Sequence, residues 1–203
     1  MADKTQRQRQ GERTRRKILD AAARLFIRKG FYGTSIADLA KAAGLTKGAL
    51  YHHFEGKDAL FFAVVEDVRD TWREAVVRDV LKAEDAPTRL AVLLDNHARL
   101  IAKNEALCLV ISSLVMEMDS SKPAFRAALQ ELYNDMARFI ERIVQKGQAA
   151  GQVRSDLEAR AVAVTLVGML RGCSCAQILD RLGASYAKRT ATMKRIVLDS
   201  LRP

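Results

Sequence analysis

The sequence is poor in residues that interrupt helices or build disulfide scaffolds. It has three prolines and three cysteines among 203 residues, and aromatic residues make up 6% of it. Its β-branched residues do not alternate with polar ones, so the pattern of a half-buried strand is missing. Cys108, Cys173 and Cys175 are odd in number and lack framework spacing, which argues against a secreted disulfide-rich protein.

Motifs of common catalytic and metal-binding sites are also missing. The chain has no phosphate-binding glycine loop, no H-E-x-x-H, no G-x-S-x-G and no C-x-x-C. Cys173 and Cys175 form a C-x-C pair inside an apolar stretch. Since no nearby His or Cys completes a metal site, we interpret them as small buried hydrophobic residues rather than metal ligands. We therefore expect no enzyme, no catalytic residue, no bound metal and no cofactor.

Long apolar runs are few. The longest, 106–116 and 161–170, are too short to span a bilayer and contain Ser, Thr or Gly. No apolar targeting segment follows Met1, so we expect a cytoplasmic protein. The composition is nonetheless 49% hydrophobic, which indicates a globular chain with a substantial core.

Positive charge is present and unevenly distributed. The formal net charge is +10. Residues 1–56 carry twelve Lys or Arg and five Asp or Glu, giving +7, whereas the remainder carries twenty-two and nineteen, giving +3. A basic amino-terminal region on a near-neutral body is typical of a protein that binds a polyanion. Charge alone is equally compatible with a solvated basic surface.

Apolar residues recur at helical spacing along most of the chain, which predicts an all-α fold. Residues 1–11 are polar and basic and are expected to form a flexible arm. A first helix should end at Gly30, before two short helices at about 36–43 and 46–54. Ser155 and Glu158 form a candidate capping box for a later helix. Long helices are expected over 57–82, from 87 to about 101, over 105–118, after 123 to about 150, over 155–182 and over 188–201.

The stretch most informative about function runs from Ile36 to Phe54. Two short helices that cross steeply through a tight turn form a helix-turn-helix. Gly44 supplies the turn, where a Cβ would be strained, and Ala40 is small enough to let the second helix approach. The second helix would then present Lys47, Gly48, Ala49, Tyr51 and His52 outward, where small residues let the backbone approach base edges in the major groove.

The run TSIADLAKAAGLTKGALYHHF, from Thr34 to Phe54, resembles the signature of TetR-family transcriptional regulators. The preceding helix up to Gly30 and the segment Lys57–Leu60 are similar as well, so the resemblance covers about residues 12–72. It implies an N-terminal three-helix DNA-binding domain over 12–56, with the helix-turn-helix at about 36–55. A larger helical domain for ligand binding and dimerisation would follow over 57–203.

The resemblance also implies roles for single residues. Thr46, Lys47, Gly48 and Ala49 would open the recognition helix, and Tyr51 and His52 would lie against the DNA backbone or base edges. Thr34 and Lys57, at the starts of neighbouring helices, would contact phosphates. Tyr51 could instead be a core aromatic residue. His53 is interpreted as a packing residue, because adjacent histidines on a helix point about 100° apart and chelate poorly.

Two further sets of residues are expected in the C-terminal domain. Gly168, Gly172 and Ala176 lie one helical turn apart, and small residues at this spacing allow helices to pair closely. In this family the last two helices pair with those of a second subunit, although packing within one subunit is the alternative. Apolar helices in the family also line a ligand pocket. The candidates here are Trp72, His97, Ser112, Met116, Met136, Phe139 and Arg171. The alternative is that they are core residues, which is the more common role of a Met or aromatic residue at helical spacing.

The sequence therefore predicts a homodimeric repressor that binds a palindromic double-stranded DNA operator and is released by a small, largely apolar inducer. A helical interaction module without nucleic-acid binding is disfavoured by the outward Lys47 and His52. The basic amino-terminal residues Lys4, Arg7, Arg9, Arg13, Arg15 and Arg16 also argue against it. An activator or a ligand-independent nucleoid protein remains an alternative. The sequence names neither the operator nor the inducer.

Overall fold

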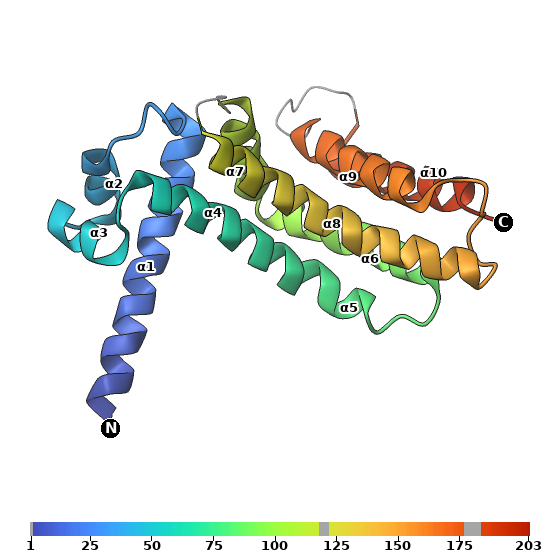
Figure 1. The fold of residues 1–203 in the computed structure, drawn as a ribbon, viewed down its shortest axis with the longest axis horizontal. Helices are drawn as coiled ribbons and strands as arrows, with labels where there is room; N and C mark the ends of the chain where they lie inside the picture. Colours follow the sequence, from blue (N-terminus) through green and yellow to red (C-terminus); the bar gives the residue numbers. More distant parts are fainter. Residues whose placement is uncertain (1, 118–121, 177–183) are drawn as a thin grey trace. The chain divides into compact units, whose positions relative to one another are not determined.

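The computed structural model describes residues 2–117, 122–176 and 184–203, and within these ranges it contains helices and no strand (Figure 1). The predicted all-α fold is confirmed. The helices are α1 (Ala2–Lys29), α2 (Ile36–Ala43), α3 (Lys47–His53), α4 (Lys57–Trp72), the π-helical segment η1 (Arg73–Val77), α5 (Arg78–Val80), α6 (Ala86–Lys103), α7 (Ala106–Met116), α8 (Pro123–Ala149), α9 (Ala159–Ala176) and α10 (Tyr186–Ser200).

The chain divides into two compact units. Unit 1 comprises residues 1–67 and 109–128, and unit 2 comprises residues 68–108 and 129–203. Helices α4, α7 and α8 each contribute residues to both units. The predicted domain boundary at 56/57 is placed at the end of the helix-turn-helix sequence pattern. The two compact units instead divide between residues 67 and 68, within α4.

Unit 1 has a core of aromatic side chains from segments far apart in the sequence. The Phe61 and Phe125 rings stack with centroids 3.8 Å apart, and Phe31 meets Phe125 edge-on at 5.1 Å. Ile18, Phe26 and the other buried residues of α1 complete this core. Such pairs add to the free energy gained by burying the rings, by about 0.5–1.5 kcal/mol each.

Unit 2 has a separate core formed by one apolar stripe from each of its helices. Asp85 caps α6 by accepting from the Thr88 N–H at 2.7 Å, and Pro87 occupies its first turn, as expected for a helix start. The core consists of Trp72, Val76, Val80, Ala86, Leu90, Leu93, Leu94, Ala137, Ile140, Ile143, Val144, Val153, Ala159, Ala163, Leu166, Leu170, Met193, Val197 and Leu201.

Two predicted segments differ from the structure. The expected flexible arm is helical, because α1 begins at Ala2; Gly11 is the one residue of segment 2–11 with a strong preference against helix. The helix predicted from Ser155 begins at Ala159 instead. Gln148 donates to the carbonyls of Arg154 and Leu157 at 3.1 and 2.8 Å, so segment 154–157 turns rather than opening a helix.

The remaining helix predictions agree with the structure to within a few residues. The helix predicted over 57–82 continues through η1 to Val80. The predicted end of the helix at Leu182 and most of the loop predicted at 119–123 lie outside the described residues.

Candidate DNA interface and effector site

Helix α2 begins at a complete capping box. Ser35 Oγ accepts from the Asp38 backbone N–H at 3.1 Å, and the Asp38 carboxylate accepts from the Ser35 N–H at 3.1 Å. Hydrogen bonding from Ser35, aided by Lys29 at 3.0 Å, lowers the pKa of Asp38 to about 2. The ionised carboxylate therefore joins the start of α2 to the end of α1.

The turn between α2 and α3 depends on Gly44. Its φ and ψ of 69° and 37° are left-handed, a conformation that glycine adopts without strain. The Leu45 N–H donates back to the Ala40 carbonyl at 2.9 Å, which closes the end of α2. Leu39 and Ala40 of α2 and Leu50 of α3 are buried, as expected for the inward sides of the two helices. The predicted helix-turn-helix is thus present.

Helix α3 presents one polar face to solvent. Thr46 caps the helix, because its hydroxyl accepts from the Ala49 N–H at 3.1 Å. Lys47, Gly48 and His52 are exposed, Ala49 is half-buried, and Tyr51 is 52% exposed. The alternative that Tyr51 is a core aromatic residue is therefore wrong. We call Lys47, Gly48, Tyr51 and His52 the recognition surface.

Two residues expected to contact phosphates are engaged within the protein. Thr34 is 1% exposed and its hydroxyl donates to the Gly30 carbonyl at 2.6 Å, so its side chain is engaged within the protein. Lys57 Nζ donates to the Phe31 carbonyl at 2.8 Å and lies 4.4 Å from the centre of the Phe31 ring. Burial, and then the charge of Lys122, lowers the pKa of Lys57. Lys57, the first residue of α4, is therefore half-buried and holds the turn that follows α1.

The same turn is held by a carboxylate that the sequence analysis did not identify. Glu117 accepts from the N–H groups of Phe31 and Tyr32 at 2.6 and 3.2 Å. Gly30 has a φ of 73°, and a Cβ there would lie 1.5 Å from Glu117 Oε1. The glycine is thus required both by backbone conformation and by the approach of Glu117. No local sequence pattern reveals a contact between residues so far apart.

Two of the basic residues expected to bind DNA also stabilise unit 1. Arg16 forms ion pairs with Asp20 at 3.0 Å and with Asp67 at 2.6 Å. The Arg15 guanidinium lies 4.9 Å from the centre of the Phe54 ring. Both side chains are exposed, as is that of Arg13. Helix α1 therefore has a positively charged surface on which one arginine, Arg16, already forms ion pairs within the protein.

Three predicted ligand residues meet at one hollow of unit 2. Trp72, Met136 and Phe139 line a hollow of about 610 Å³ between η1, the end of α4 and the middle of α8. Trp72 is 5% exposed, and its ring meets Phe139 edge-on at 6.0 Å. We call this the α4–α8 hollow. Its volume falls within the range of small-molecule sites.

The other predicted ligand residues lie elsewhere. His97 is buried in unit 2, where its Nε2 lies 3.3 Å from Ser174 Oγ, and burial lowers its pKa to about 4. Arg171 lies over the Tyr133 ring at 5.0 Å. Ser112 is half-buried in unit 1. Met116 is 84% exposed in the same unit, so its expected place on a buried apolar stripe is corrected: it lies on the solvent side of α7.

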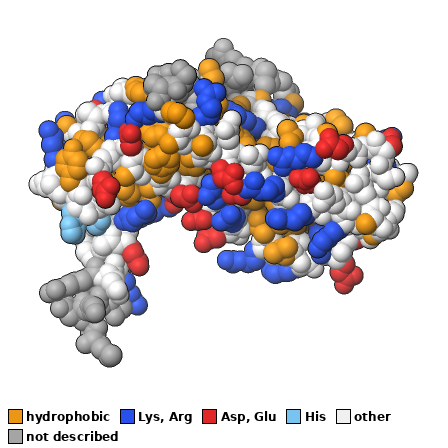
Figure 2. All heavy atoms as spheres, in the orientation of Figure 1, with side chains coloured by type: hydrophobic (Ala, Val, Ile, Leu, Met, Phe, Trp, Pro, Cys, Tyr) orange, Lys and Arg blue, Asp and Glu red, His pale blue; other side chains and the backbone are white. Residues whose placement is uncertain are grey.

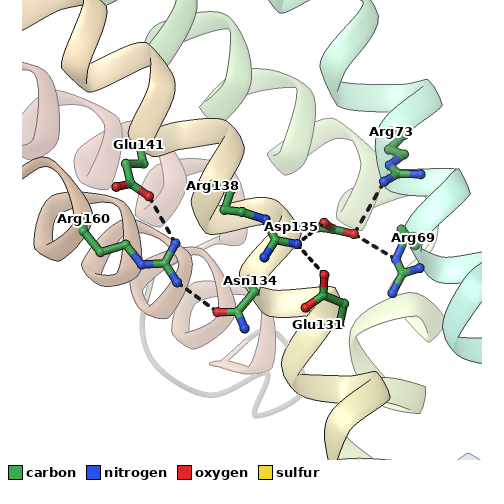
Figure 3. A network of polar contacts seen from close by, with 8 residues as sticks. All are labelled: Arg69, Arg73, Glu131, Asn134, Asp135, Arg138, Glu141 and Arg160. Atoms are coloured by element: carbon green, nitrogen blue, oxygen red, sulfur yellow. Dashed lines mark hydrogen bonds and ion pairs between the residues drawn. The ribbon is translucent and has the colours of Figure 1, made fainter.

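The α4–α8 hollow also contains a group of arginines that the sequence analysis did not single out. Figure 3 shows Arg69, Arg73 and Arg138 converging on Asp135, with distances of 3.1, 3.5 and 2.6 Å. Arg78 and Arg142 line the same hollow. On the face shown in Figure 2, basic side chains gather with acidic ones over this part of the molecule. The pairs 69/73 and 138/142, each one helical turn apart, were the available signal.

Helix α9 carries an exposed face of small and apolar residues. Gly168 and Gly172 are exposed, and no atom of the described residues lies within 4 Å of a Cβ added at either position. Val164 on α9 is 51% exposed, Ile196 on α10 is 57% exposed, and Ala176 is half-buried. Among the described residues, α9 is the one helix long and apolar enough to cross a membrane, with one third of it buried. Sequence runs alone did not reveal this, because the 18-residue helix extends beyond the apolar run at 161–170.

Two family models match the chain. Bacterial regulatory proteins of the tetR family match residues 18–64, and the tetracyclin repressor-like C-terminal domain matches residues 86–193. Among curated relatives, the fatty acid metabolism regulator protein of Bacillus subtilis (strain 168) is 22% identical over 75% of this chain and 77% of its own length. The regulator AcrR of Shigella flexneri is 48% identical over 32% of this chain and 30% of its own length.

Solved structures share the fold. The fatty acid degradation regulator FadR from Bacillus halodurans has a TM-score of 0.80 at 18% identity, covering 93% of this chain and 96% of its own. FadR from Bacillus subtilis in complex with stearoyl-CoA has a TM-score of 0.79 at 17% identity, covering 92% and 98%. AibR in complex with isovaleryl coenzyme A and operator DNA has a TM-score of 0.75 at 22% identity, covering 90% and 97%.

The C-terminal family model alone covers more than half of the chain, and the amino-terminal model covers the helix-turn-helix. The partners of such a protein are operator DNA, a small-molecule ligand and a second copy of the chain. This chain therefore belongs to the TetR family of bacterial regulatory proteins and is a ligand-responsive, DNA-binding transcriptional regulator rather than an enzyme.

Proposed function

We propose that the recognition surface on α3 reads one half-site of a palindromic operator in the major groove, and that two subunits read the two halves. The observation that carries this proposal is the exposure of Lys47, Gly48, Tyr51 and His52 on a helix held by Thr46 and the Gly44 turn. One such helix covers a few base pairs, so a two-fold dimer is needed for useful specificity.

The residue types divide the work of recognition. Lys47 is the long cation of the surface and is placed to donate to guanine acceptors. Gly48 and the half-buried Ala49 have small side chains or none, so the backbone at the start of α3 can approach the groove closely. Tyr51 and His52 would then reach the phosphates or base edges further along the helix. In this proposal Thr34 and Lys57 act through the turn that they stabilise, and only their backbone groups lie near DNA.

Replacing Lys47 by alanine tests this proposal directly. Lys47→Ala should weaken binding to the specific operator by about 1–3 kcal/mol, or roughly 5–150-fold, because a base contact is lost. Fluorescence anisotropy with labelled operator measures the change. Lys146→Ala, which removes an exposed lysine from α8 in unit 2, is the matched control and should bind as the wild type does. Unchanged operator binding by Lys47→Ala would show that α3 is not the reading helix.

We further propose that the effector is an acyl thioester whose apolar part lies against Trp72, Met136 and Phe139. Support comes from the hollow that these three residues line and from two relatives of the same fold, whose structures contain stearoyl-CoA and isovaleryl coenzyme A. His97, Ser112 and Arg171 would be secondary to this site. The exposed Met116 would not contact the effector.

The proposed dimer uses α9 and α10. The exposed Val164, Gly168, Gly172 and Ile196 give these helices an apolar, closely approachable face of the kind that subunits bury in a four-helix bundle. A hollow of about 270 Å³ between the two helices, lined by residues such as Ala161 and Met169, adds to the surface that a partner can fill. With DNA as its target, we propose that the protein is cytoplasmic.

A further inference from the structure

We infer that the α4–α8 hollow binds a phosphate-bearing part of the effector, with Arg73, Arg78 and Arg142 contacting phosphate oxygens beside the Trp72 ring. The inference rests on the proposed function, since the bound molecule is the effector. It adds the chemical class of the group recognised and the residues that recognise it.

Charge is the first observation. The residues lining the hollow include five arginines, Arg69, Arg73, Arg78, Arg138 and Arg142, and two carboxylates, Glu74 and Asp135, which leaves a net charge of +3. Adjacent Glu131, which pairs with Arg138, lowers the local excess to +2. Guanidinium groups bind phosphates through paired hydrogen bonds, so a hollow with this excess favours an anion.

The arginines of the hollow differ in their exposure and in the ion pairs and hydrogen bonds that they form within the protein. Arg69 is 15% exposed and pairs with Asp135, which places it in the supporting wall (Figure 3). Arg73 is 56% exposed and reaches Asp135 at 3.5 Å. The side chains of Arg78 and Arg142 are exposed and have no hydrogen bond or ion pair within the described part of the chain. Two arginines are thus available to a ligand without breaking an internal contact.

The wall of the hollow offers a complementary apolar and polar surface. Trp72 is 5% exposed, and its Nε1 has no hydrogen-bond partner among the described residues. Because a buried N–H without a partner costs free energy, a ligand acceptor would stabilise it. Arg73 is the first residue of the π-helical segment η1 and Arg78 directly follows it; π-helical geometry is uncommon and frequently found at functional sites. A molecule with an apolar part and a phosphate group matches this combination.

Trp72 fluorescence tests the inference, because the chain has one tryptophan. Stearoyl-CoA, free coenzyme A and stearate would each be titrated into wild-type protein and into Arg78→Gln, Arg142→Gln and the double variant. We expect coenzyme A and stearoyl-CoA to bind about tenfold more weakly for each arginine removed, and stearate binding to change little. Arg126→Gln is the control, since Arg126 is also an exposed arginine of α8 but lies outside the hollow.

The outcomes separate this inference from the proposed function. Operator release by stearoyl-CoA with equal binding to wild type and double variant would overturn the phosphate site and leave the effector class standing. Arginine-dependent binding of coenzyme A without operator release by any acyl-CoA would support the site and overturn the proposed effector. Failure of coenzyme A to bind wild-type protein at millimolar concentration would also overturn the site.

A second inference rests on a separate cluster of sulfur atoms in unit 2. Cys108 Sγ in α7 lies 3.5 Å from Cys175 Sγ in α9, and both residues are half-buried. Cys173 Sγ instead lies 3.6 Å from Met193 Sδ. We propose that Cys108 and Cys175 form a reversible disulfide when the protein meets a hydroperoxide, linking α7 to α9.

The chemistry balances with a hydroperoxide as the oxidant. One thiolate attacks the peroxide, giving a sulfenic acid and the corresponding alcohol or water. The second thiol attacks the sulfenic sulfur, the S–S bond forms and a water molecule leaves, so that two thiols are oxidised as one peroxide is reduced. Cys173 is left out of this reaction because its sulfur lies against Met193 Sδ, whereas Cys108 and Cys175 lie against each other.

Non-reducing peptide mass spectrometry tests this pairing. After hydrogen peroxide treatment we expect a linked peptide pair containing Cys108 and Cys175, which dithiothreitol should reverse. Cys173→Ser should keep the link, and Cys108→Ser or Cys175→Ser should abolish it. The linked protein should unfold several degrees higher, because a disulfide restricts the unfolded chain. Absence of the link, or a link through Cys173 instead, would overturn the proposal.

Discussion

The double variant Gly168→Leu, Gly172→Leu is expected to be a monomer that has lost specific operator binding by about a thousandfold or more, down to the non-specific level. Within the part of the subunit that the structure describes, no atom lies within 4 Å of a Cβ at either position, so the added side chains have room there. In the proposed dimer they would hold the two α9 helices apart. A monomer keeps one recognition surface and so cannot contact both half-sites.

Sedimentation velocity measures the oligomeric state, and anisotropy with operator DNA measures the binding. Gly11→Leu is a suitable control, since Gly11 is another helical glycine with open space around its Cβ position. The control should remain dimeric, and all variants should retain the thermal stability of a folded subunit. A wild-type protein that is monomeric at micromolar concentration, or a double variant that remains dimeric, would contradict the α9–α10 interface.

The second large effect is release of the operator by the effector. A saturating acyl-CoA should lower operator affinity by roughly 5–150-fold, corresponding to a coupling free energy of about 1–3 kcal/mol. The helix that carries Trp72 in unit 2 also carries Lys57 in unit 1, without a break between them. The operator requires two recognition helices about 34–36 Å apart, so a ligand that favours another separation weakens binding by its differential affinity for the two states.

Reciprocity provides the check on this coupling. Operator DNA should weaken acyl-CoA binding, followed by Trp72 fluorescence, by the same factor by which acyl-CoA weakens operator binding. Because this equality holds for any coupling at equilibrium, unequal factors would mean that the two titrations do not follow the same pair of binding events. An acyl-CoA that binds tightly beside Trp72 and never changes operator affinity would refute the coupling.

Sequence patterns predicted those features that depend on nearby residues. The turn at Gly44 follows from a short-range rule and is present, and the capping box of Ser35 and Asp38, found in the structure, obeys a rule of the same range. The apolar periodicity predicted every long helix, because burial of one face determines where a helix is stable. These features were sufficient to identify the helix-turn-helix.

Features that depend on contacts between distant segments were not predictable in the same way. Thr34 is buried because the chain closes on Gly30, and Glu117 completes that turn from 86 residues away. Met116 has a hydrophobic side chain that α7 leaves in solvent. The arginines of the α4–α8 hollow meet because α4 and α8 pack side by side, which the sequence does not reveal. The spacing of four residues within the pairs 69/73 and 138/142 shows only that each pair lies on one side of its own helix.

The most direct test of the account is an anisotropy titration of the wild-type protein against a DNA fragment that contains an inverted repeat next to its gene, with and without acyl-CoA. We predict two subunits per repeat and an affinity that falls with salt by a log–log slope of about 0.9 per phosphate contacted. We also predict preference for the repeat over scrambled DNA, and release on adding the effector. Equal affinity for repeat and scrambled DNA, unchanged by any acyl-CoA, would contradict a ligand-controlled operator-binding dimer.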